Sequence, residues 1–132
     1  MKKEVVFPAG MPKPAGIWSP VIVVENPGKL AFLSGFVSRG ANGEVVGIGD
    51  IRAQTRQVCE NLKAAVTAAG GTLADLVRVD VFITDMSLFK EIHEVRKEYF
   101  PKDPPASTMV EINRMTHPDF MIEINAIAAI TN

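Results

Sequence analysis

Four polar side chains in the second half of the sequence could carry out chemistry on a small molecule. Glu123 stands in the apolar run FMIEINAIAAI, Ser107 and Thr108 precede the run MVEI, and His93 lies in a helix-like segment. A carboxylate can activate a water molecule, and an imidazole can give or take a proton near neutral pH. Hydroxyl and backbone N–H groups can bind a carboxylate without supplying charge. Acid–base chemistry and carboxylate binding are therefore the first possibilities to consider.

Period-two patterns predict the strands that must hold these residues. In residues 76–83 (LVRVDVFI), valine and isoleucine alternate with Arg, Asp and Phe, which is typical of a strand buried mainly on one side. Two further strands are predicted at about 107–113 and 120–130, separated by the turn-forming sequence THPD. A short strand is predicted at 3–7. Most of the candidate polar residues thus belong to strands.

The remaining N-terminal residues predict a loop and a hairpin. Proline and glycine at alternating positions from Pro8 to Gly16 indicate a loop that runs over the surface or along a cleft. The apolar runs 21–24 and 30–34 flank Asn-Pro-Gly, a turn signal, so we interpret them as a β-hairpin.

Two amphipathic helices complete the predicted fold. The first is capped by Asp50, carries apolar residues at three- and four-residue steps through 51–69, and ends at Gly70-Gly71. The second covers 88–99, is capped by Asp85 or Ser87, and ends before Pro101. The order β-β-β-α-β-α-β-β predicts an α+β domain spanning 1–132, a mixed sheet with both helices on one face.

Composition argues against several classes of function. The net charge is -1 and basic residues are scattered, which does not favour nucleic-acid binding. Cys59 is the single cysteine and the chain has only two histidines, so we predict no disulfide, no metal and no organic cofactor. There is no apolar run of about 18 residues and no secretory signal at Met1, so we expect no membrane association and a cytoplasmic location.

Several motifs resemble the Rid family, also called YjgF or L-PSP endoribonuclease-like, along nearly the whole chain. The run PPASTMVE and the later EINAIA are similar to the family's Pro-(Ala/Thr)-Arg-Ser-(Thr/Cys)-Val-Glu and Glu-Ile-Glu-Ala-Ile-Ala. Gly-Ile-Trp-Ser-Pro resembles its Gly-x-Tyr-Ser, and Leu33-Ser34-Gly35 its (Val/Thr)-Ser-Gly-Gln. Ser107 stands where the family has an arginine, and Asn125 where it commonly has a second glutamate.

The resemblance implies a chorismate-mutase-like fold and a homotrimer whose sheets form a central barrel, with a ligand cleft at each interface. It also implies hydrolysis of reactive enamines or imines to a keto compound and ammonia. Glu123 matches the glutamate thought to orient the attacking water, or else is an interface glutamate paired with a neighbour's cation. Ser34 and Gly35 match cleft-lining residues, and Ser107 and Thr108 match the substrate-anchoring pair.

The departures at cleft positions open alternatives for the ligand. Serine has neither the charge nor the reach of arginine, so another cation could hold a substrate carboxylate. Arg39 is the first candidate and Arg114 the second, against solvated surface roles for both. Trp18 would give the pocket a larger, flatter wall or would pack an interface. His93 would serve as acid or base, or would be a solvated or capping histidine.

Three functions follow from these observations. The first is a Rid-type deaminase acting on an enamine or imine larger than 2-aminoacrylate, such as an aminomuconate-like intermediate. The second is a non-catalytic trimer that binds small carboxylates, since the arginine is missing. The third and weakest is the ribonuclease activity of the family's older name, which the near-neutral charge does not support.

Overall fold

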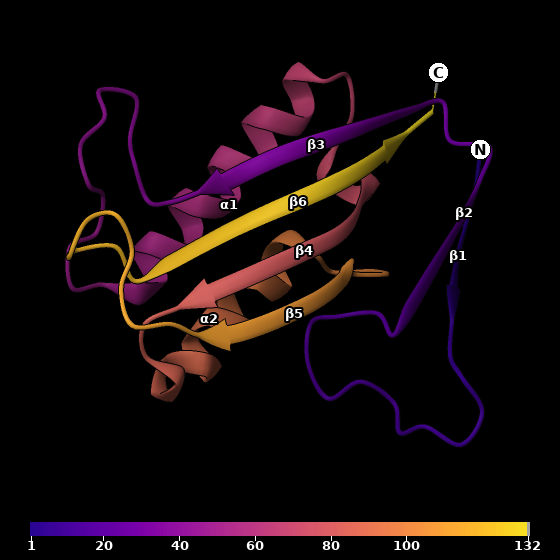
Figure 1. The fold of residues 1–132 in the computed structure, drawn as a ribbon, viewed down its shortest axis with the longest axis horizontal. Helices are drawn as coiled ribbons and strands as arrows, with labels where there is room; N and C mark the ends of the chain where they lie inside the picture. Colours follow the sequence, from indigo (N-terminus) through magenta and orange to yellow (C-terminus); the bar gives the residue numbers. More distant parts are fainter. Residues whose placement is uncertain (132) are drawn as a thin grey trace.

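The computed structural model describes residues 1–131, which form a mixed sheet covered on one face by two helices, and a separate strand pair. The mixed sheet has the strand order β3-β6-β4-β5 (Figure 1). Its strands are β3 (Lys29–Phe36), β4 (Leu76–Ile83), β5 (Ala106–Glu111) and β6 (Ile122–Ile130). β6 runs antiparallel to β3 and β4, and β4 runs parallel to β5.

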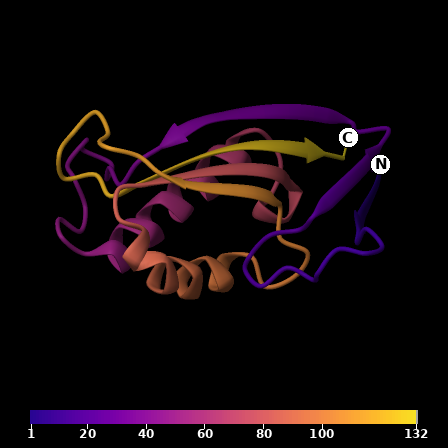
Figure 2. The ribbon, with the colours of Figure 1, turned by 60° about the horizontal axis from the view of Figure 1, so that its bottom comes forward.

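The two helices α1 (Ile51–Ala68) and α2 (Phe89–Tyr99) pack on the same face of this sheet (Figure 2). The Asp50 side chain caps α1 by accepting a hydrogen bond from Ala53 N, as the sequence predicts. Short 3-10 helices, η1 (Leu73–Asp75) and η2 (Met86–Leu88), precede β4 and α2. Asp85 caps η2 rather than α2 itself, through Ser87 N.

The core lies between the helices and the sheet, and it follows from the alternation along β6. Ile122, Ile124, Ala126 and Ala128 are at most 3% exposed, whereas the residues between them face away from the helices. On β4 the same holds for Val79, Val81 and Ile83. Val77 was expected on this buried face but is half-buried, because the register with β6 shifts between Leu76 and Arg78.

No other helix or strand of the described residues covers the sheet face opposite the two helices (Figure 2), and this face is partly apolar. Phe32 and Leu30 on β3 are 74% and 55% exposed, and Val110 on β5 is 41% exposed. Exposed aromatic and aliphatic side chains on a sheet face commonly mark a surface that another protein covers. Neither helix in the described residues is long and apolar enough to cross a membrane.

The predicted hairpin of runs 21–24 and 30–34 is wrong. β2 (Val21–Glu25) pairs antiparallel with β1 (Lys2–Val6) and not with β3, although the turn that joins β2 to β3 is short. The β1–β2 pair stands beside the main sheet (Figure 1). Asn26 adopts a φ of 51°, so the chain does turn there as its sequence indicates. A turn signal fixes a change of direction, but not which strands exchange hydrogen bonds.

Candidate functional site

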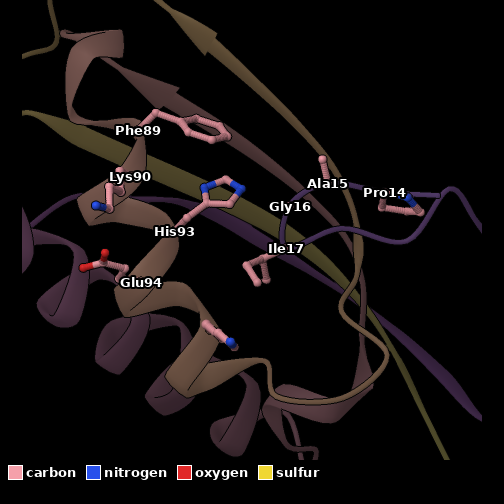
Figure 3. Close-up of a pocket in the computed structure, with 9 residues that line it drawn as sticks. Pro14, Ala15, Gly16, Ile17, Phe89, Lys90, His93 and Glu94 are labelled. Atoms are coloured by element: carbon pink, nitrogen blue, oxygen red, sulfur yellow. The ribbon is translucent and has the colours of Figure 1, made fainter. Parts of the chain in front are cut away.

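The loop before β2 lies against α2 and encloses one of the candidate residues, His93. A cavity of about 400 Å³ opens between loop residues 14–17 and the side chains of α2 from Phe89 to Lys97. The imidazole of His93 points from α2 toward the loop and stacks on the Phe89 ring, with 3.9 Å between ring centres (Figure 3). A methyl group at Gly16 would overlap His93 Nε2, so glycine allows this close approach.

The imidazole of His93 lines the cavity, but its two nitrogens are covered by the protein. Neither of its ring nitrogens has a hydrogen-bond partner in the described residues, although both are buried. Burial lowers the pKa of His93, and the nearby positive charge of Arg96 lowers it further. The neutral imidazole is therefore the form favoured by the fold, and it can accept a proton.

Ser107 lies at the start of β5 on the helix side of the sheet, next to a buried arginine that the sequence analysis did not single out. The Nη2 of Arg96 donates hydrogen bonds to Ser107 Oγ at 3.2 Å and to the carbonyl oxygen of Ile17 at 3.3 Å. Arg96 is 1% exposed, and its Nε has no partner among residues 1–131. The site thus contains a cation beside Ser107, although Ser107 itself is neutral.

The charge of Arg96 is not balanced by an acidic side chain. None of the ion pairs in the described part of the chain includes Arg96. Burial lowers the pKa of Arg96 to about 10, which still leaves it positively charged at neutral pH. The buried Cys59 lies near it, and burial raises the pKa of that thiol to about 12, so Cys59 is a neutral thiol.

Trp18 belongs to the same region. It is 36% exposed and follows Ile17, whose carbonyl oxygen accepts from Arg96. The next residue, Ser19, is held against the chain segment that leads into β5, through Ser19 N to Pro105 O at 3.1 Å and Ser19 Oγ to Pro104 O. Trp18, His93 and Ser107 therefore form one group, which we call the helix-side group.

Glu123, Ser34 and Gly35 form a second group, at the junction of β3 and β6. A Cβ atom at Gly35 would lie 2.5 Å from Glu123 Oε2, so the carboxylate rests directly against the glycine backbone. The β3–β6 register shifts between Leu33 and Phe36, which places Ser34 and Gly35 in an irregular part of the strand. Glu123 takes part in no ion pair with any residue that the structure describes.

Thr108 lies on the other face of β5 from Ser107, because successive strand residues alternate. Its hydroxyl accepts a hydrogen bond at 2.6 Å from Arg78, which also pairs with Asp80. Asn125 lies on the same open face, where its side-chain oxygen accepts from Asp80 N at 3.1 Å. The side chains of Thr108 and Ser107 therefore lie on opposite faces of β5.

The arginines proposed from the sequence lie elsewhere. Arg39 is exposed; its Nη1 donates to Gly43 O at 2.7 Å, and its guanidinium lies 4.8 Å from the centre of the Phe120 ring. Arg114 is exposed in the segment between β5 and β6. His117 Nδ1 accepts a hydrogen bond from Asp119 N at 3.1 Å within the turn before β6.

The two groups of candidate residues lie apart in one chain. Ser34 and Gly35 are on β3 and Ser107 is on β5, the opposite edges of the sheet, with β6 and β4 between them. Three inter-strand spacings separate these edges by about 14 Å. Glu123 is nearer, on β6, but it lies on the open face whereas Ser107 faces the helices, so a small molecule does not bridge the two groups of a single chain.

Arg96 could have been found from its position in the sequence. It lies four residues after Ile92 and three after His93, on the stripe of the second helix that was predicted to be buried. An arginine on a buried stripe needs a polar partner, which is the signal that was missed. Its actual partners lie in the loop and on β5, and helix periodicity does not predict them.

The fold and motifs define a class of small α+β proteins, and comparison with known proteins identifies it. The family model described as endoribonuclease L-PSP matches residues 9–130. The chain therefore belongs to the endoribonuclease L-PSP family, also known as YjgF or Rid, as its motifs predict.

Two relatives match over almost their full length. A RutC family protein of Pyrococcus horikoshii is 43% identical over 127 residues, which cover 96% of this chain and 97% of that protein. The 3-aminoacrylate deaminase RutC of Acinetobacter baylyi is 35% identical over 128 residues, which cover 97% of this chain and 98% of that protein.

Solved structures confirm the predicted fold class. A protein of the Rid family from Yersinia pestis has a TM-score of 0.88 at 31% identity and covers 98% of this chain and 100% of its own. The E. coli protein TdcF, crystallised with bound serine, has a TM-score of 0.72 at 32% identity and covers 88% of this chain and 92% of its own.

Proposed function

We propose that the protein hydrolyses an enamine or imine that carries a carboxylate, releasing a keto compound and ammonia. The observation that carries this proposal is the 35% identity, over 97% of the chain, to a 3-aminoacrylate deaminase. The replacement of the family arginine by Ser107 and the presence of Trp18 favour a substrate larger than 2-aminoacrylate, such as an aminomuconate-like compound.

The reaction needs little beyond positioned proton transfer. The enamine gains a proton on carbon and loses one from nitrogen to become an imine. Water then adds across the C=N bond, and the resulting carbinolamine loses ammonia to give the carbonyl product. Glu123 orients the water and takes its proton, and His93 moves protons between carbon and nitrogen. Each such group contributes about 100- to 10,000-fold.

The active site is shared between two copies of the chain. The separation of about 14 Å between the sheet edges supports this, because one chain cannot bring both groups to the same ligand. One subunit contributes Trp18, His93 and Ser107, and its neighbour contributes Ser34, Gly35 and Glu123. The exposed apolar face around Phe32 gives the subunits a surface on which to associate, as a homotrimer.

Ammonia release measures this activity directly. Purified protein is added to 2-aminoacrylate, 3-aminoacrylate or an aminomuconate-type enamine, each generated in place, and ammonia is recorded against the spontaneous rate. We expect acceleration with at least one substrate and a loss of about 100-fold or more in Glu123→Gln. Lys63→Gln, an exposed change on α1 outside both groups, serves as the control. The proposal fails if the wild-type rate equals the spontaneous rate for all substrates.

A binding protein without catalysis is the second candidate, and the serine bound to TdcF favours it. Thermal denaturation separates the two functions, because a ligand at 100 times its dissociation constant stabilises by about 2.7 kcal/mol. Stabilisation by small carboxylates, with no ammonia released from any enamine, identifies a binding protein.

A further inference from the structure

We infer that Arg96 supplies the positive charge for a ligand carboxylate and that Ser107 presents that charge to the ligand through its hydroxyl group. Because the carboxylate belongs to the substrate proposed above, this role of Arg96 rests on that proposed function. Arg96 and Ser107 together would do what one arginine at position 107 is expected to do in relatives. Arg96 is then a specificity-determining residue that acts through Ser107.

The first support is geometric. Arg96 Nη2 donates to Ser107 Oγ at 3.2 Å, so the oxygen of that hydroxyl is already used as an acceptor. The hydroxyl hydrogen remains free to donate, and a carboxylate oxygen is the strongest acceptor it can meet. Ser107 is only partly buried whereas Arg96 is 1% exposed, so a ligand that approaches the pair meets Ser107 first.

The second support is the unbalanced charge of Arg96. The guanidinium is 1% exposed, is held by one carbonyl and one hydroxyl oxygen, and has an Nε without a partner in residues 1–131. Removing a cation from water is costly unless an anion compensates, and no acidic side chain does so in the described chain. A ligand carboxylate at Ser107 would supply the missing negative charge.

The third support is the arrangement around the pair. His93 precedes Arg96 by less than one helical turn, and its two ring nitrogens are buried and without partners. The carbonyl of Ile17 fixes the guanidinium beside the loop that carries Trp18. Arg96 therefore supplies the charge, Ser107 the hydrogen-bond donor, His93 the imidazole and Trp18 a flat apolar wall. These four residues belong to α2, β5 and the loop before β2.

Trp18 makes the inference testable without turnover, because it is the only tryptophan in the sequence. Benzoate and benzamide have the same shape, but only benzoate carries a charge, so the ratio of their affinities measures carboxylate preference. Both are titrated against the full-length protein and followed by Trp18 fluorescence, with 2-oxobutyrate as a non-aromatic carboxylate. We expect the wild-type protein to prefer benzoate.

Arg96→Gln should reduce the preference for benzoate over benzamide by about 10- to 100-fold while benzamide binding changes little. The double variant Arg96→Gln with Ser107→Arg should restore the preference, because it returns a guanidinium to the same place. Arg56→Gln, which removes an exposed arginine of α1, is the matched control and should leave the preference unchanged.

Two results would overturn the role of Arg96. One is an unchanged preference in Arg96→Gln. The other is an equal loss of benzoate and benzamide binding that the double variant does not reverse, as expected of an arginine that only holds the loop in place. If Arg96→Gln does not fold, the ratio of benzoate to benzamide affinity is measured instead in the double variant and in Arg96→Lys, and it tests the role of Arg96 in the same way.

The same variants separate this inference from the proposed function. The wild-type protein could release ammonia while its preference for benzoate is the same with and without Arg96. That result would support the deaminase activity and rule out the role of Arg96. A preference for benzoate that depends on Arg96, without ammonia release from any enamine, would support the role of Arg96 and rule out the deaminase activity. Absence of benzoate and 2-oxobutyrate binding in the wild-type protein would overturn the carboxylate subsite itself.

Discussion

Arg96 already occupies the space that a longer side chain at position 107 would need. Ser107→Arg would place a second guanidinium beside Arg96, which is 1% exposed and whose Nη2 lies 3.2 Å from Ser107 Oγ. We expect repulsion and crowding to lower the free energy of unfolding by about 1–3 kcal/mol and to weaken ligand binding. Restored 2-aminoacrylate turnover in this single variant, with intact stability, would contradict this expectation.

His93 makes the stability of the fold depend on pH. Its pKa is lowered from 6.5 by burial and by Arg96, so the unfolded chain binds a proton at a pH where the folded chain does not. Stability from the neutral imidazole is therefore present above pH 6.5 and is lost as the pH falls below it.

Chemical unfolding at pH 7.5 and at pH 5.5 measures this loss. His93→Asn should show a smaller decrease in stability between the two pH values than the wild-type protein, because asparagine does not titrate. Thr67→Asn, an exposed change on α1 that introduces the same side chain, is the control and should behave like the wild type. An identical decrease in the wild-type protein and in His93→Asn would show that His93 does not contribute.

The sequence predicts which residues belong to the site better than it predicts the groups that these residues contact. His93 was proposed from its place on the second helix, and the structure puts it beside the cavity. The substitute cation was sought at Arg39, but that guanidinium is bound to Gly43 O and lies over Phe120. Loop residues 8–20 have no hydrophobic period, so the sequence does not show that they cover Arg96.

Among the elements, α1 has a single buried glutamine that joins three segments. The Nε2 of Gln54 donates to Gly47 O at 3.2 Å and to Asp119 O at 2.7 Å, and its Oε1 accepts from Met121 N at 2.9 Å. These bonds fix the loop after β3 and the turn before β6. Both lie near the end of the sheet where β6 begins, one residue before Glu123. Gln54 therefore positions the chain on both sides of the β3–β6 group.

Gln54→Leu should lower the free energy of unfolding by about 2–4 kcal/mol, because it removes three hydrogen bonds of a buried side chain and leaves Asp119 O and Met121 N without the partner that Gln54 provides. Gln57→Leu is the matched change on the same helix, where the side chain bonds only to Asn61, and should cost less than about 1 kcal/mol. Urea unfolding of both variants compares them. Equal costs would mean that the three bonds of Gln54 contribute no more than the one bond of Gln57.

Most elements could be predicted from the sequence because their patterns are local. The first helix was predicted at 51–69 with Asp50 as its cap, and α1 spans Ile51–Ala68 with that cap. The strand at Leu76–Ile83 agrees at both ends. Pairing is a long-range property, which is why the expected hairpin is wrong: β2 bonds to β1, some 20 residues earlier in the sequence, instead of to β3.

For the whole molecule, the open sheet face should determine assembly. Phe32 is 74% exposed in the chain, and burying a phenylalanine against a neighbour contributes about 1.5–3 kcal/mol. Sedimentation equilibrium of the wild-type protein should give three times the chain mass of 14.3 kDa. Phe32→Glu should give the mass of one chain, because each interface would have to bury a carboxylate. Phe7→Glu, at a residue that is 61% exposed but lies outside the sheet face, should remain assembled.

The most direct test of a shared active site is complementation between two inactive variants. Glu123→Gln removes the water-orienting carboxylate, and Ser107→Asp blocks the carboxylate subsite by pairing with Arg96. Each variant alone should release no ammonia above the spontaneous rate. After the two are co-expressed, random assembly of trimers should leave about a quarter of the sites with both native groups, and ammonia release should return to about that fraction. Mixed trimers verified by mass spectrometry that stay inactive would contradict a site built from two subunits.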